Sequence, residues 1–547
     1  MANRYDAIVI GGGHNGLTSG AYFARAGANT VVLEADDHTG GAADTSAPFP
    51  NHPDVKVTTY SYVVSLVPPT IINDLGLKRF GYNIIPFGPY FQAYPDGRAV
   101  RVYPDDASKS HESISQFSKK DADAMEEWEA WLKGVADVLG PLLLQVPPKL
   151  GSKSVGDLLD AAKSGWKMRG LDVRGVASVT KLFTMSVSDL LSEWFESDAV
   201  KGMLTVNGVI GTWAGPDEPG TAYVMLHHSI GDVGDGHLGS WGFQEGGMGA
   251  VSQCFRDAAE SFGCEVRTNA RVSKITTQNG RVTGVVLDNG EELTAPTVVT
   301  SIHPKIAFLD LIDQGDLPAD FVRDIENWKT RSGVVKVNVA MSELPKFTAA
   351  KDYNDTNADG IPEHLTGSVE LCFSTEYAER AFQDAHMDRK AATAPFVDGV
   401  IPTTLVDGLG DKKNGIHNFS MFTQWCPDDW NEEPHTEELD AYANRIFDLY
   451  NDMAPNFKDS IVDYQVIGPY DMEQRVGLLG GNIFHGELSV DQLFHMRPAP
   501  GYADFRTPIK GLYHGSCATH GGGGINGIPG WQAFKQAKKD GQVRSST

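Results

Sequence analysis

Tyr5-Asp-Ala-Ile-Val-Ile-Gly-Gly-Gly-His-Asn-Gly16 is the stretch of sequence that decides the fold. Its first half, Tyr5 to Ile10, is a short apolar run with branched side chains, which is typical of a buried parallel strand. The glycine-rich turn leads into a helical stretch, Leu17 to Ala26, that ends at Gly27. A second strand, Thr30-Val-Val-Leu33, completes a strand–helix–strand unit in under 40 residues. This arrangement predicts a Rossmann-like domain with a parallel sheet.

The glycines of this turn have the spacing G-x-G-x-x-G, which binds the pyrophosphate of a dinucleotide when a strand precedes it and a helix follows. Gly11 allows the tight turn, Gly13 lets the pyrophosphate approach the backbone, and Gly16 lets the helix pack close to the strand. The helix N-terminus adds unpaired N–H groups and a partial positive charge. Glu34, at the end of the second strand, can accept hydrogen bonds from the hydroxyls of the adenosine ribose. A strand–helix–strand unit that binds no nucleotide is the weaker alternative in this context.

The composition excludes several other classes of protein. A chain of 547 residues with 41% hydrophobic residues is long enough for two domains with sizeable cores. A formal net charge of -25 argues against nucleic acid and against an anionic membrane surface as partners. The five cysteines are scattered without a C-x-x-C pair, which argues against a redox-active dithiol and suits a reducing compartment. No signal peptide and no apolar run of roughly 20 residues is visible, so we expect a cytoplasmic protein.

The residues after the second strand favour FAD over NAD as the dinucleotide. The first glycine motif alone does not separate these two cofactors. Glu34-Ala-Asp-Asp-His-Thr-Gly40-Gly41-Ala42 places a pair of glycines where many FAD enzymes continue the surface that binds the pyrophosphate. Glycines suit this place because the cofactor would lie directly against the backbone.

Motifs along nearly the whole chain resemble the phytoene desaturase-like branch of the FAD-dependent amine oxidase superfamily. The segments that carry the resemblance are Gly11-Gly-Gly-His-Asn-Gly-Leu17, Gly40-Gly-Ala-Ala43, Ser186-Val-Ser-Asp-Leu-Leu191, Val206-Asn-Gly-Val-Ile-Gly-Thr-Trp-Ala214, Gly246-Gly-Met-Gly-Ala250, Gly480-Gly-Asn-Ile-Phe-His-Gly486, Asp491-Gln-Leu-Phe494 and Gly511 to Gly530. The chain has His38 and Ala42 where the wider superfamily has arginines, and it lacks the proline that many desaturases have after the position of His520.

The resemblance implies FAD as the cofactor, bound by three separate parts of the chain. The implied contacts are Gly11, Gly13, His14, Asn15, Gly16, Glu34, Ala35, Gly41, Ala42, Val272, Gly515, Ser516, Gly524, Ile525 and Asn526. Val272 matches the residue whose backbone usually meets the adenine, and Gly515 to Gly527 matches the stretch at the flavin end. A helix that starts near Gly524 to Asn526 would direct its N–H groups at the pyrimidine edge of the isoalloxazine and stabilise negative charge on the reduced flavin.

We expect an α/β protein in which a three-layer, Rossmann-like FAD-binding domain carries an inserted α+β substrate domain. The FAD-binding domain is predicted over residues 1–105, 238–310 and 466–547, and the substrate domain over residues 106–237 and 311–465. The first part of the substrate domain is predicted to be mostly helical, because Asp121 to Leu139 and Ser186 to Val200 have helical spacing with acidic outer faces. Asn279-Gly280 and Asn289-Gly290 predict hairpin turns between strands of the FAD-binding domain.

The resemblance also implies a reaction. A hydride would pass from a C–H bond of a small apolar substrate, isoprenoid or lipid-like, to flavin N5, with formation of a double bond. An electron acceptor such as oxygen or a quinone would then reoxidise the flavin. Three alternatives stay open: a redox-neutral isomerase or a saturase that uses reduced FAD, a flavin-bound interaction factor with little turnover, and an amine oxidase.

Two histidines are candidates for catalysis. His485 and His520 fall in or near the flavin-facing C-terminal part and could move protons or orient substrate. The alternative is that they bond to the backbone in a crowded, glycine-rich region. Aromatic residues in Phe87 to Tyr94, together with Phe494 and Trp531, could line a substrate tunnel or belong to the core.

Two further stretches each have a functional and a purely structural interpretation. Asp355-Thr-Asn-Ala-Asp-Gly360 copies the start of a calcium loop, but Thr366 stands where the bidentate Glu belongs, so a solvated acidic turn is favoured over a metal site. Val135 to Val146 is the most apolar part of the helical insert and could make a peripheral membrane contact. A buried helix is favoured there, because polar residues and a nearby proline pair interrupt the run.

Overall fold

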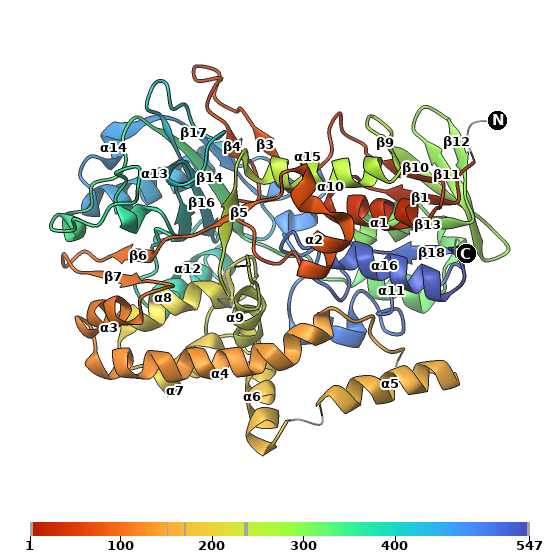
Figure 1. The fold of residues 1–547 in the computed structure, drawn as a ribbon, viewed down its shortest axis with the longest axis horizontal. Helices are drawn as coiled ribbons and strands as arrows, with labels where there is room; N and C mark the ends of the chain where they lie inside the picture. The colour runs from red at the N-terminus through yellow and green to blue at the C-terminus, as the bar shows by residue number, and fades with distance from the viewer. Residues whose placement is uncertain (1–3, 150, 169–170, 235–238, 544–547) are drawn as a thin grey trace.

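Two sheets with helices around them form the core of the protein. The computed structural model describes residues 4–149, 151–168, 171–234 and 239–543. In Figure 1 the parallel sheet lies on the right, the second sheet on the left, and a layer of helices runs beneath both. Both chain ends lie on the right, beside the parallel sheet.

The parallel sheet is assembled from strands far apart in the sequence. Its order is β18-β13-β1-β2-β9, and every neighbouring pair is parallel. The strands are β1 (Ala7–Ile10), β2 (Thr30–Leu33), β9 (Glu265–Arg267), β13 (Thr297–Thr300) and β18 (Leu512–His514). The sheet therefore needs the N-terminal, middle and C-terminal thirds of the chain.

The parallel sheet is the middle one of three layers, because the side chains of β1 alternate between two apolar cores, one on each face. Val9 packs with α1 (His14–Arg25), α10 (Gly247–Ser261) and α16 (Ile528–Lys539) on one face. Ile8 and Ile10 pack on the other face against the antiparallel sheet of β10 (Val272–Gln278), β11 (Arg281–Leu287) and β12 (Glu292–Thr294). The Rossmann-like α/β fold predicted from the sequence is confirmed.

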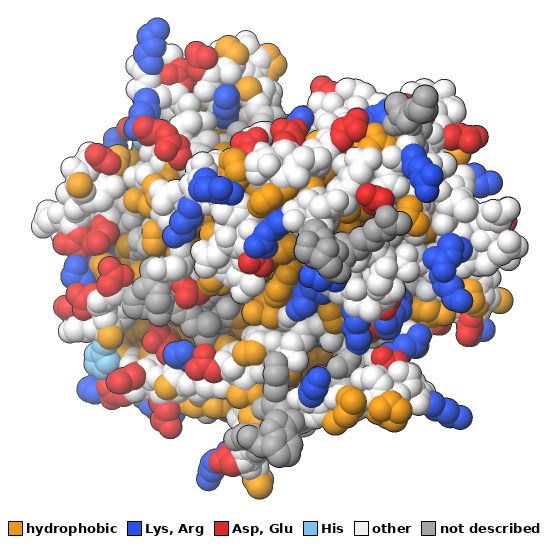
Figure 2. All heavy atoms as spheres, turned by 45° about the vertical axis from the view of Figure 1, so that its right-hand side comes forward, with side chains coloured by type: hydrophobic (Ala, Val, Ile, Leu, Met, Phe, Trp, Pro, Cys, Tyr) orange, Lys and Arg blue, Asp and Glu red, His pale blue; other side chains and the backbone are white. Residues whose placement is uncertain are grey.

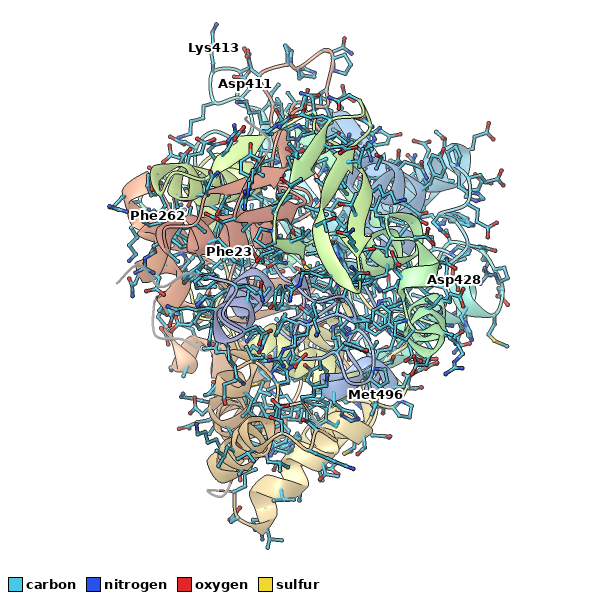
Figure 3. The ribbon with its side chains drawn as sticks, turned by 90° about the vertical axis from the view of Figure 1, so that its right-hand side faces the viewer. Phe23, Phe262, Asp411, Lys413, Asp428 and Met496 are labelled. Atoms are coloured by element: carbon cyan, nitrogen blue, oxygen red, sulfur yellow. The ribbon has the colours of Figure 1, made fainter. Side chains whose placement is uncertain are left out.

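Phe23 shows how closely the helices of this domain pack. Figure 3 labels it in the interior, while Asp411 and Lys413 lie at the tip of an outer loop. The Phe23 ring meets the ring of Phe534 on α16 edge-on, with centroids 5.1 Å apart.

Both turns expected at Asn-Gly pairs are present, and Asn279 has a φ of 52° and Gly280 of 70°.

The second sheet is antiparallel and has one apolar and one partly polar face. Its order is β15-β16-β14-β17, with β14 (Val334–Met341), β15 (Phe396–Val400), β16 (His417–Gln424) and β17 (Ile461–Ile467). Val335, Val337 and Val339 point into a core shared with α12 (Thr375–His386) and α13 (Thr436–Met453). Lys336 and Asn338 alternate with them and therefore face the other way, although both are fully buried.

The segment between Ala107 and Ser229, called the helical insert, is mostly helical, as expected. Its helices are α3 (Ala107–Ser115), α4 (Lys119–Leu143), α5 (Val155–Met168), α6 (Val173–Thr184), α7 (Val187–Trp194), α8 (Asp198–Val209) and α9 (Thr221–Ser229). The stretch with helical spacing from Ser186 to Val200 forms α7 and the start of α8, with a break between them. The Asp121 carboxylate explains the break, because it accepts hydrogen bonds from the N–H groups of Glu196 (2.9 Å) and Ser197 (2.8 Å).

The remaining helices and strands are short. They are β3 (Thr45–Ser46), β4 (Val57–Thr58), α2 (Pro69–Leu75), β5 (Ile84–Pro86), β6 (Tyr90–Ala93), β7 (Ala99–Val102), β8 (Gly242–Gln244), α11 (Ala319–Glu326), α14 (Phe457–Ser460) and α15 (Pro469–Val476). Phe91 and Val100, which precede the boundary predicted at residue 105, pack in the core of the substrate side. The cause is backbone pairing: Phe91 N–H donates to Ser368 O over 2.8 Å.

The helical insert presents apolar side chains to solvent. Val155, Leu158 and Leu159 of α5 and Val173 and Val176 of α6 are all more than half exposed. Figure 2 shows basic and acidic side chains interspersed on one face, with apolar side chains at its lower edge. Among the helices of the described residues, none is both long and apolar enough to span a membrane.

Candidate active site

The glycine turn after β1 leaves room in front of Gly13. Gly11 has a φ of +96°, and a Cβ on Gly16 would lie 1.9 Å from Gly11 O, so both positions need glycine for the turn and for helix packing. A Cβ on Gly13 would meet only Gly40 O, at 3.8 Å. The protein itself therefore does not fill the space beside Gly13, as a site for a pyrophosphate against the backbone requires.

The N-terminus of α1 is suited to an anion. Its N-cap is Gly13, no side chain caps the helix, and no acidic residue lies in its first turn. The second glycine pair lies alongside, because Gly40 N–H donates to Gly12 O over 3.0 Å. Gly41 has a φ of +57°, and a Cβ there would meet only Gly13 Cα, at 3.6 Å. Helix N–H groups and glycine backbone thus form one continuous surface for phosphate oxygens.

Glu34 supports the glycine turn as well as facing the expected ribose site. Its Oε2 accepts the N–H of Gly12 over 2.7 Å, and its Oε1 accepts the N–H of Asp36 over 3.0 Å. Burial raises the pKa of this carboxyl group. Each carboxylate oxygen retains a lone pair for a ribose hydroxyl. The backbone carbonyl of Glu34 accepts the N–H of Ala270 over 2.8 Å. Val272, at the start of β10, follows two residues later and therefore lies near this acid.

The C-terminal stretch lies directly against α1. A Cβ on Gly530 would lie 2.0 Å from Asn15 O, so the two helices touch backbone to backbone. Asn15 Nδ2 donates to Cys517 Sγ over 3.3 Å, close to Gly515 and Ser516. The structure therefore brings the N-terminal and C-terminal candidate residues together in one place.

The helix expected to start near Gly524 to Asn526 begins at Ile528 instead. Asn526 Oδ1 accepts the N–H of Ile528 over 2.8 Å, and the N-cap Gly527 has a φ of +72°. Ile525 has a φ of +55°, which a β-branched residue rarely adopts. Gly524 and Ile525 consequently form a tight loop before the helix, and both line the main cavity.

Buried polar atoms without a partner lie where the cofactor is expected. His14 Nε2, Asn15 Oδ1 and His485 Nδ1 have no hydrogen-bond partner within the described part of the chain. Such orphaned atoms are uncommon in folded proteins and call for a bound polar group. Together with the open glycine surface, they fit FAD.

His485 and His520 both lie outside the lining of the main cavity. Burial, followed by His14 and Arg497, lowers the pKa of His485 to about 3, and its carbonyl accepts Trp328 Nε1–H over 2.7 Å. His520 Nε2 bonds to Leu142 O over 3.0 Å, and burial lowers its pKa as well. Both rings are therefore neutral at pH 7, and His520 has a backbone partner.

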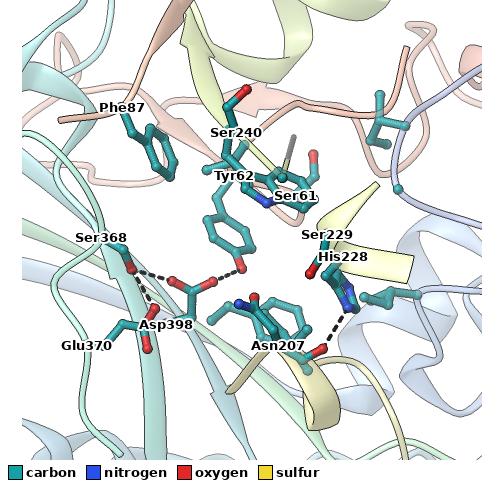
Figure 4. Close-up of a pocket in the computed structure, with 18 of the residues that line it drawn as sticks. Ser61, Tyr62, Phe87, Asn207, His228, Ser229, Ser240, Ser368, Glu370 and Asp398 are labelled. Atoms are coloured by element: carbon teal, nitrogen blue, oxygen red, sulfur yellow. Dashed lines mark hydrogen bonds between the residues drawn. The ribbon is translucent and has the colours of Figure 1, made fainter. Parts of the chain in front are cut away.

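The main cavity joins the two domains (Figure 4) and has a volume of about 330 Å³. Ala42, Gly524 and Ile525 line it from the cofactor-binding segments. Its apolar walls are Phe87, Ile210, Trp241, Phe422, Met472, Leu478, Ile483 and Phe484. A mostly apolar pocket of this size with a few polar groups is typical of a small-molecule site.

Sequence reasoning missed the polar residues of this cavity. His228, Asn207, Tyr62, Glu370 and Asp398 line it, and all come from the substrate side or the loops beside it. A signal was present: single acids interrupt otherwise apolar strand stretches in Val369-Glu-Leu-Cys372 and Phe396-Val-Asp-Gly-Val400. An acid inside a buried strand is a functional candidate, because burying an unpaired charge is costly.

A second, apolar cavity of about 310 Å³ lies at the end of α4. Leu142, Leu143 and Val146 line it, together with Phe494 and His520. The apolar stretch Val135 to Val146 therefore packs partly in the core and partly around this cavity. Trp531 instead packs beside Tyr22, with centroids 6.4 Å apart.

The described residues contain no group of three or more His, Cys, Asp or Glu that could hold a metal ion. All five cysteines are buried and free of disulfides. In the stretch that copies a calcium loop, Asn357 Oδ1 accepts the N–H groups of Asp359 and Ile361, both over 3.0 Å, as in an ordinary turn.

Two family models match parts of the chain. Residues 9–70 match the NAD(P)-binding Rossmann-like domain, and residues 177–408 match the flavin containing amine oxidoreductase family. The first match covers the glycine turn and Glu34, and the second covers Glu370, Asp398 and His228.

Curated relatives match over nearly the full length. Pyridine nucleotide-disulfide oxidoreductase domain-containing protein 2 of Rattus norvegicus is 36% identical over 97% of this chain and 92% of its own length. One of the limonene dehydrogenase chains of Castellaniella defragrans is 26% identical over 98% and 94%. The lycopene-forming phytoene desaturase of Pseudescherichia vulneris is 22% identical over 95% and 96%.

Among solved structures, cyclohexylamine oxidase of Brevibacterium oxydans has the same fold. The TM-score is 0.57 with 16% identity, over 98% of this chain and 99% of the oxidase. At this identity the likeness concerns the fold alone.

Proposed function

Because the chain belongs to the family of pyridine nucleotide-disulfide oxidoreductase domain-containing protein 2, we propose that it dehydrogenates a largely apolar substrate. This family is an FAD-dependent branch of the amine oxidase superfamily and is similar to phytoene desaturases. When bound, FAD would accept a hydride from a C–H bond of the substrate, the neighbouring carbon would lose a proton, and a double bond would form between the two carbons. FAD supplies the two-electron chemistry when it is bound. The chain is an FAD-dependent oxidoreductase; the substrate class and the direction of the reaction are the proposal.

One observation carries the proposal. The main cavity is lined both by the cofactor-binding segments, at Ala42 and Gly524, and by apolar side chains of the substrate side, such as Ile210 and Phe422. A hydrocarbon can lie against these walls with little polar surface to satisfy. The names of two relatives, a limonene dehydrogenase and a phytoene desaturase, also support an apolar substrate.

The residues of this chain have two tasks in the reaction. The apolar walls exclude water, which keeps reactive intermediates from hydrolysis. His228 is the histidine among the described lining residues, and it can receive the proton. Its Nδ1 donates to Val224 O over 2.9 Å, which leaves Nε2 as the unprotonated nitrogen of the neutral ring. Burial lowers the His228 pKa to about 4, so the ring is a free, if weak, base at pH 7.

The test is an anaerobic titration of the purified holoenzyme with isoprenoid hydrocarbons, followed by the visible absorption of the flavin. We expect bleaching with a substrate of this class. The variant Ile210→Trp fills the cavity and should abolish bleaching, while its FAD content stays normal. Val173→Trp, on the exposed surface of α6, is the matched control and should bleach like the natural chain.

Other outcomes would redirect the proposal. Flavin that never bleaches, although it turns a substrate into an isomer, would replace dehydrogenation by a redox-neutral reaction. Equal bleaching in Ile210→Trp and in the natural chain would remove the main cavity as the substrate site. A protein that binds no FAD, even when it is added, would refute the whole proposal.

A further inference from the structure

Helix α9 separates the main cavity from the second, apolar cavity at the end of α4. The two cavities share none of their described lining residues. His227 and His228 are consecutive on α9, yet His227 lines the second cavity and His228 lines the main one. Their rings are nearly perpendicular, at 87°, with centroids 5.5 Å apart. The second cavity is therefore a separate site.

The second cavity suits an uncharged ligand with a hydrocarbon body. Leu, Val, Ile, Phe and Pro side chains form most of its wall, and its described lining residues include no Asp, Glu, Lys or Arg. Phe494 lines the cavity and is 40% exposed, so a ligand can enter from the surface beside it. Because burying an unpaired charge is costly, a charged ligand would be disfavoured here.

Arg497 does not make the site suitable for an anion. It lines a small cavity of about 20 Å³ that shares Tyr223, His227 and Phe494 with the second cavity. Its five N–H groups donate, over 2.8 to 3.4 Å, to the backbone carbonyls of Phe484, Gly486, Glu487, Gln492, Cys517 and Thr519. The guanidinium therefore has no donor left for a carboxylate.

Two polar groups of the second cavity lack a hydrogen-bond partner. His227 is 3% exposed, and its Nε2 has no partner within the described part of the chain. The hydroxyl of Tyr223 also forms no hydrogen bond to the described residues. The two residues are four apart on α9 and therefore lie on the same face of the helix. Buried polar groups without a partner are uncommon and call for a bound polar group.

The protonation of these two groups defines the ligand that they need. The His227 ring donates a hydrogen bond to the backbone of Gly523, and this bond comes from Nδ1, since Nε2 has no partner. Burial lowers the His227 pKa to about 3 and raises the Tyr223 pKa to about 12, so both groups are neutral at pH 7. Nε2 therefore needs a donor, and the Tyr223 hydroxyl can supply a hydrogen. A hydroxyl group meets both needs, because it donates one hydrogen bond and accepts others.

We propose that the second cavity binds an uncharged, lipid-like alcohol that is not the substrate, with its hydroxyl between His227 Nε2 and the hydroxyl of Tyr223. The hydrocarbon body lies along the apolar wall toward Phe494. This site lies outside the cavity in which the C–H bond is broken, so the inference goes beyond the proposed function. It also adjoins the flavin-end stretch, because a Cβ on Gly522 would lie 3.2 Å from the His227 ring.

The test compares octan-1-ol with its isomer 1-methoxyheptane, which has the same atoms but no O–H group. Calorimetry is done on holoenzyme that carries Ile210→Trp, so that the main cavity is filled. We expect octan-1-ol to bind at least about tenfold more tightly, because the ether cannot donate to Nε2 and leaves it unsatisfied. His227→Phe should remove this preference. His228→Phe changes the neighbouring ring that faces the main cavity, and as the matched control it should keep the preference.

A second variant tests the place of binding. Gly140 lines the second cavity from α4, and a Cβ there would meet nothing within 4 Å, so Gly140→Trp can fill the cavity without a clash at its first atom. This variant should abolish the binding of octan-1-ol. Gly134→Trp is the matched control, because Gly134 lies on the same helix with equal room but lines neither cavity.

The outcomes decide the inference independently of the proposed function, because none of them needs a substrate that bleaches the flavin. Equal affinity for the two isomers would overturn it, and so would a preference that survives in His227→Phe. Binding of octan-1-ol that persists in Gly140→Trp would overturn the assignment to the second cavity. A preference that is lost in His227→Phe and kept in His228→Phe supports it. If His227→Phe fails to fold, the two isomers and Gly140→Trp still decide.

Discussion

The contact between α1 and α16 yields a sharp prediction about stability. In Gly530→Ala the new Cβ would lie 2.0 Å from Asn15 O, whereas an ordinary contact needs at least 3.4 Å. The obstacle is backbone on both sides, so no side chain can rotate away. The two helices must therefore separate by about 1.4 Å, the difference between these distances.

The cost of this separation can be worked out from the contacts it breaks. Ser19 Oγ donates to Gly530 O over 2.9 Å, and the loss of that buried bond costs about 1–3 kcal/mol. The close van der Waals contacts between the helices also lose about a quarter to a half of their attractive energy. Alanine regains about 1 kcal/mol of helix propensity. We expect a net loss of about 2–4 kcal/mol in the free energy of unfolding.

The assay is urea unfolding of the holoenzyme, with Gly134→Ala on α4 as the matched control. A Cβ at Gly134 would meet nothing within 4 Å, so this variant should gain about 0.5–1 kcal/mol. Gly530→Ala should also bind FAD more weakly, because the loop at Gly524 moves with α16. If Gly530→Ala is as stable as Gly134→Ala, the close approach of the two helices is refuted.

Two further predictions concern the cofactor turn and a buried cation. Gly13→Ala should fold normally, because its Cβ meets only Gly40 O at 3.8 Å, yet lose at least about tenfold in FAD affinity; unchanged affinity in a fluorescence titration would argue against pyrophosphate at this turn. The pKa of Lys336 falls from 10.5 in the unfolded chain to about 7 in the folded one, so between these pH values the unfolded state binds more protons and stability rises with pH. Lys336→Met should flatten this rise in urea midpoints measured from pH 7 to pH 10, and an identical slope in both proteins would contradict the assignment.

The parts of the fold that were predictable from the sequence are set by local chemistry. The strand and glycine turn from Tyr5 to Gly16 form the expected unit, because each residue's role depends on its immediate neighbours. The same holds for the hairpin at Asn279-Gly280, where the turn residues fix the pairing of β10 with β11. The local sequence is therefore enough to predict these elements.

The parts that were not predictable depend on contacts between distant residues. The break before α8 comes from Asp121, which lies 75 and 76 residues away from the N–H groups it binds. The pairing of Glu370 with Asp398 depends on strand register, which no local pattern reveals. Sequence reasoning consequently placed the cofactor segments by motif, but overlooked the polar groups of the substrate cavity.

The order of strands in the parallel sheet has a consequence for synthesis of the chain. The first four strands of this sheet to be made, β1, β2, β9 and β13, can pair as they appear, but β18 starts only at Leu512. At about 5–20 residues per second, the ribosome needs roughly 10 to 40 seconds between β13 and β18. During that interval β13 is an uncovered edge, to which a neighbouring nascent chain can pair. The last strand to be made therefore covers β13 and becomes an edge itself, where the bridge between Tyr513 and Arg506 protects it, and chains that terminate before Leu512 leave β13 uncovered.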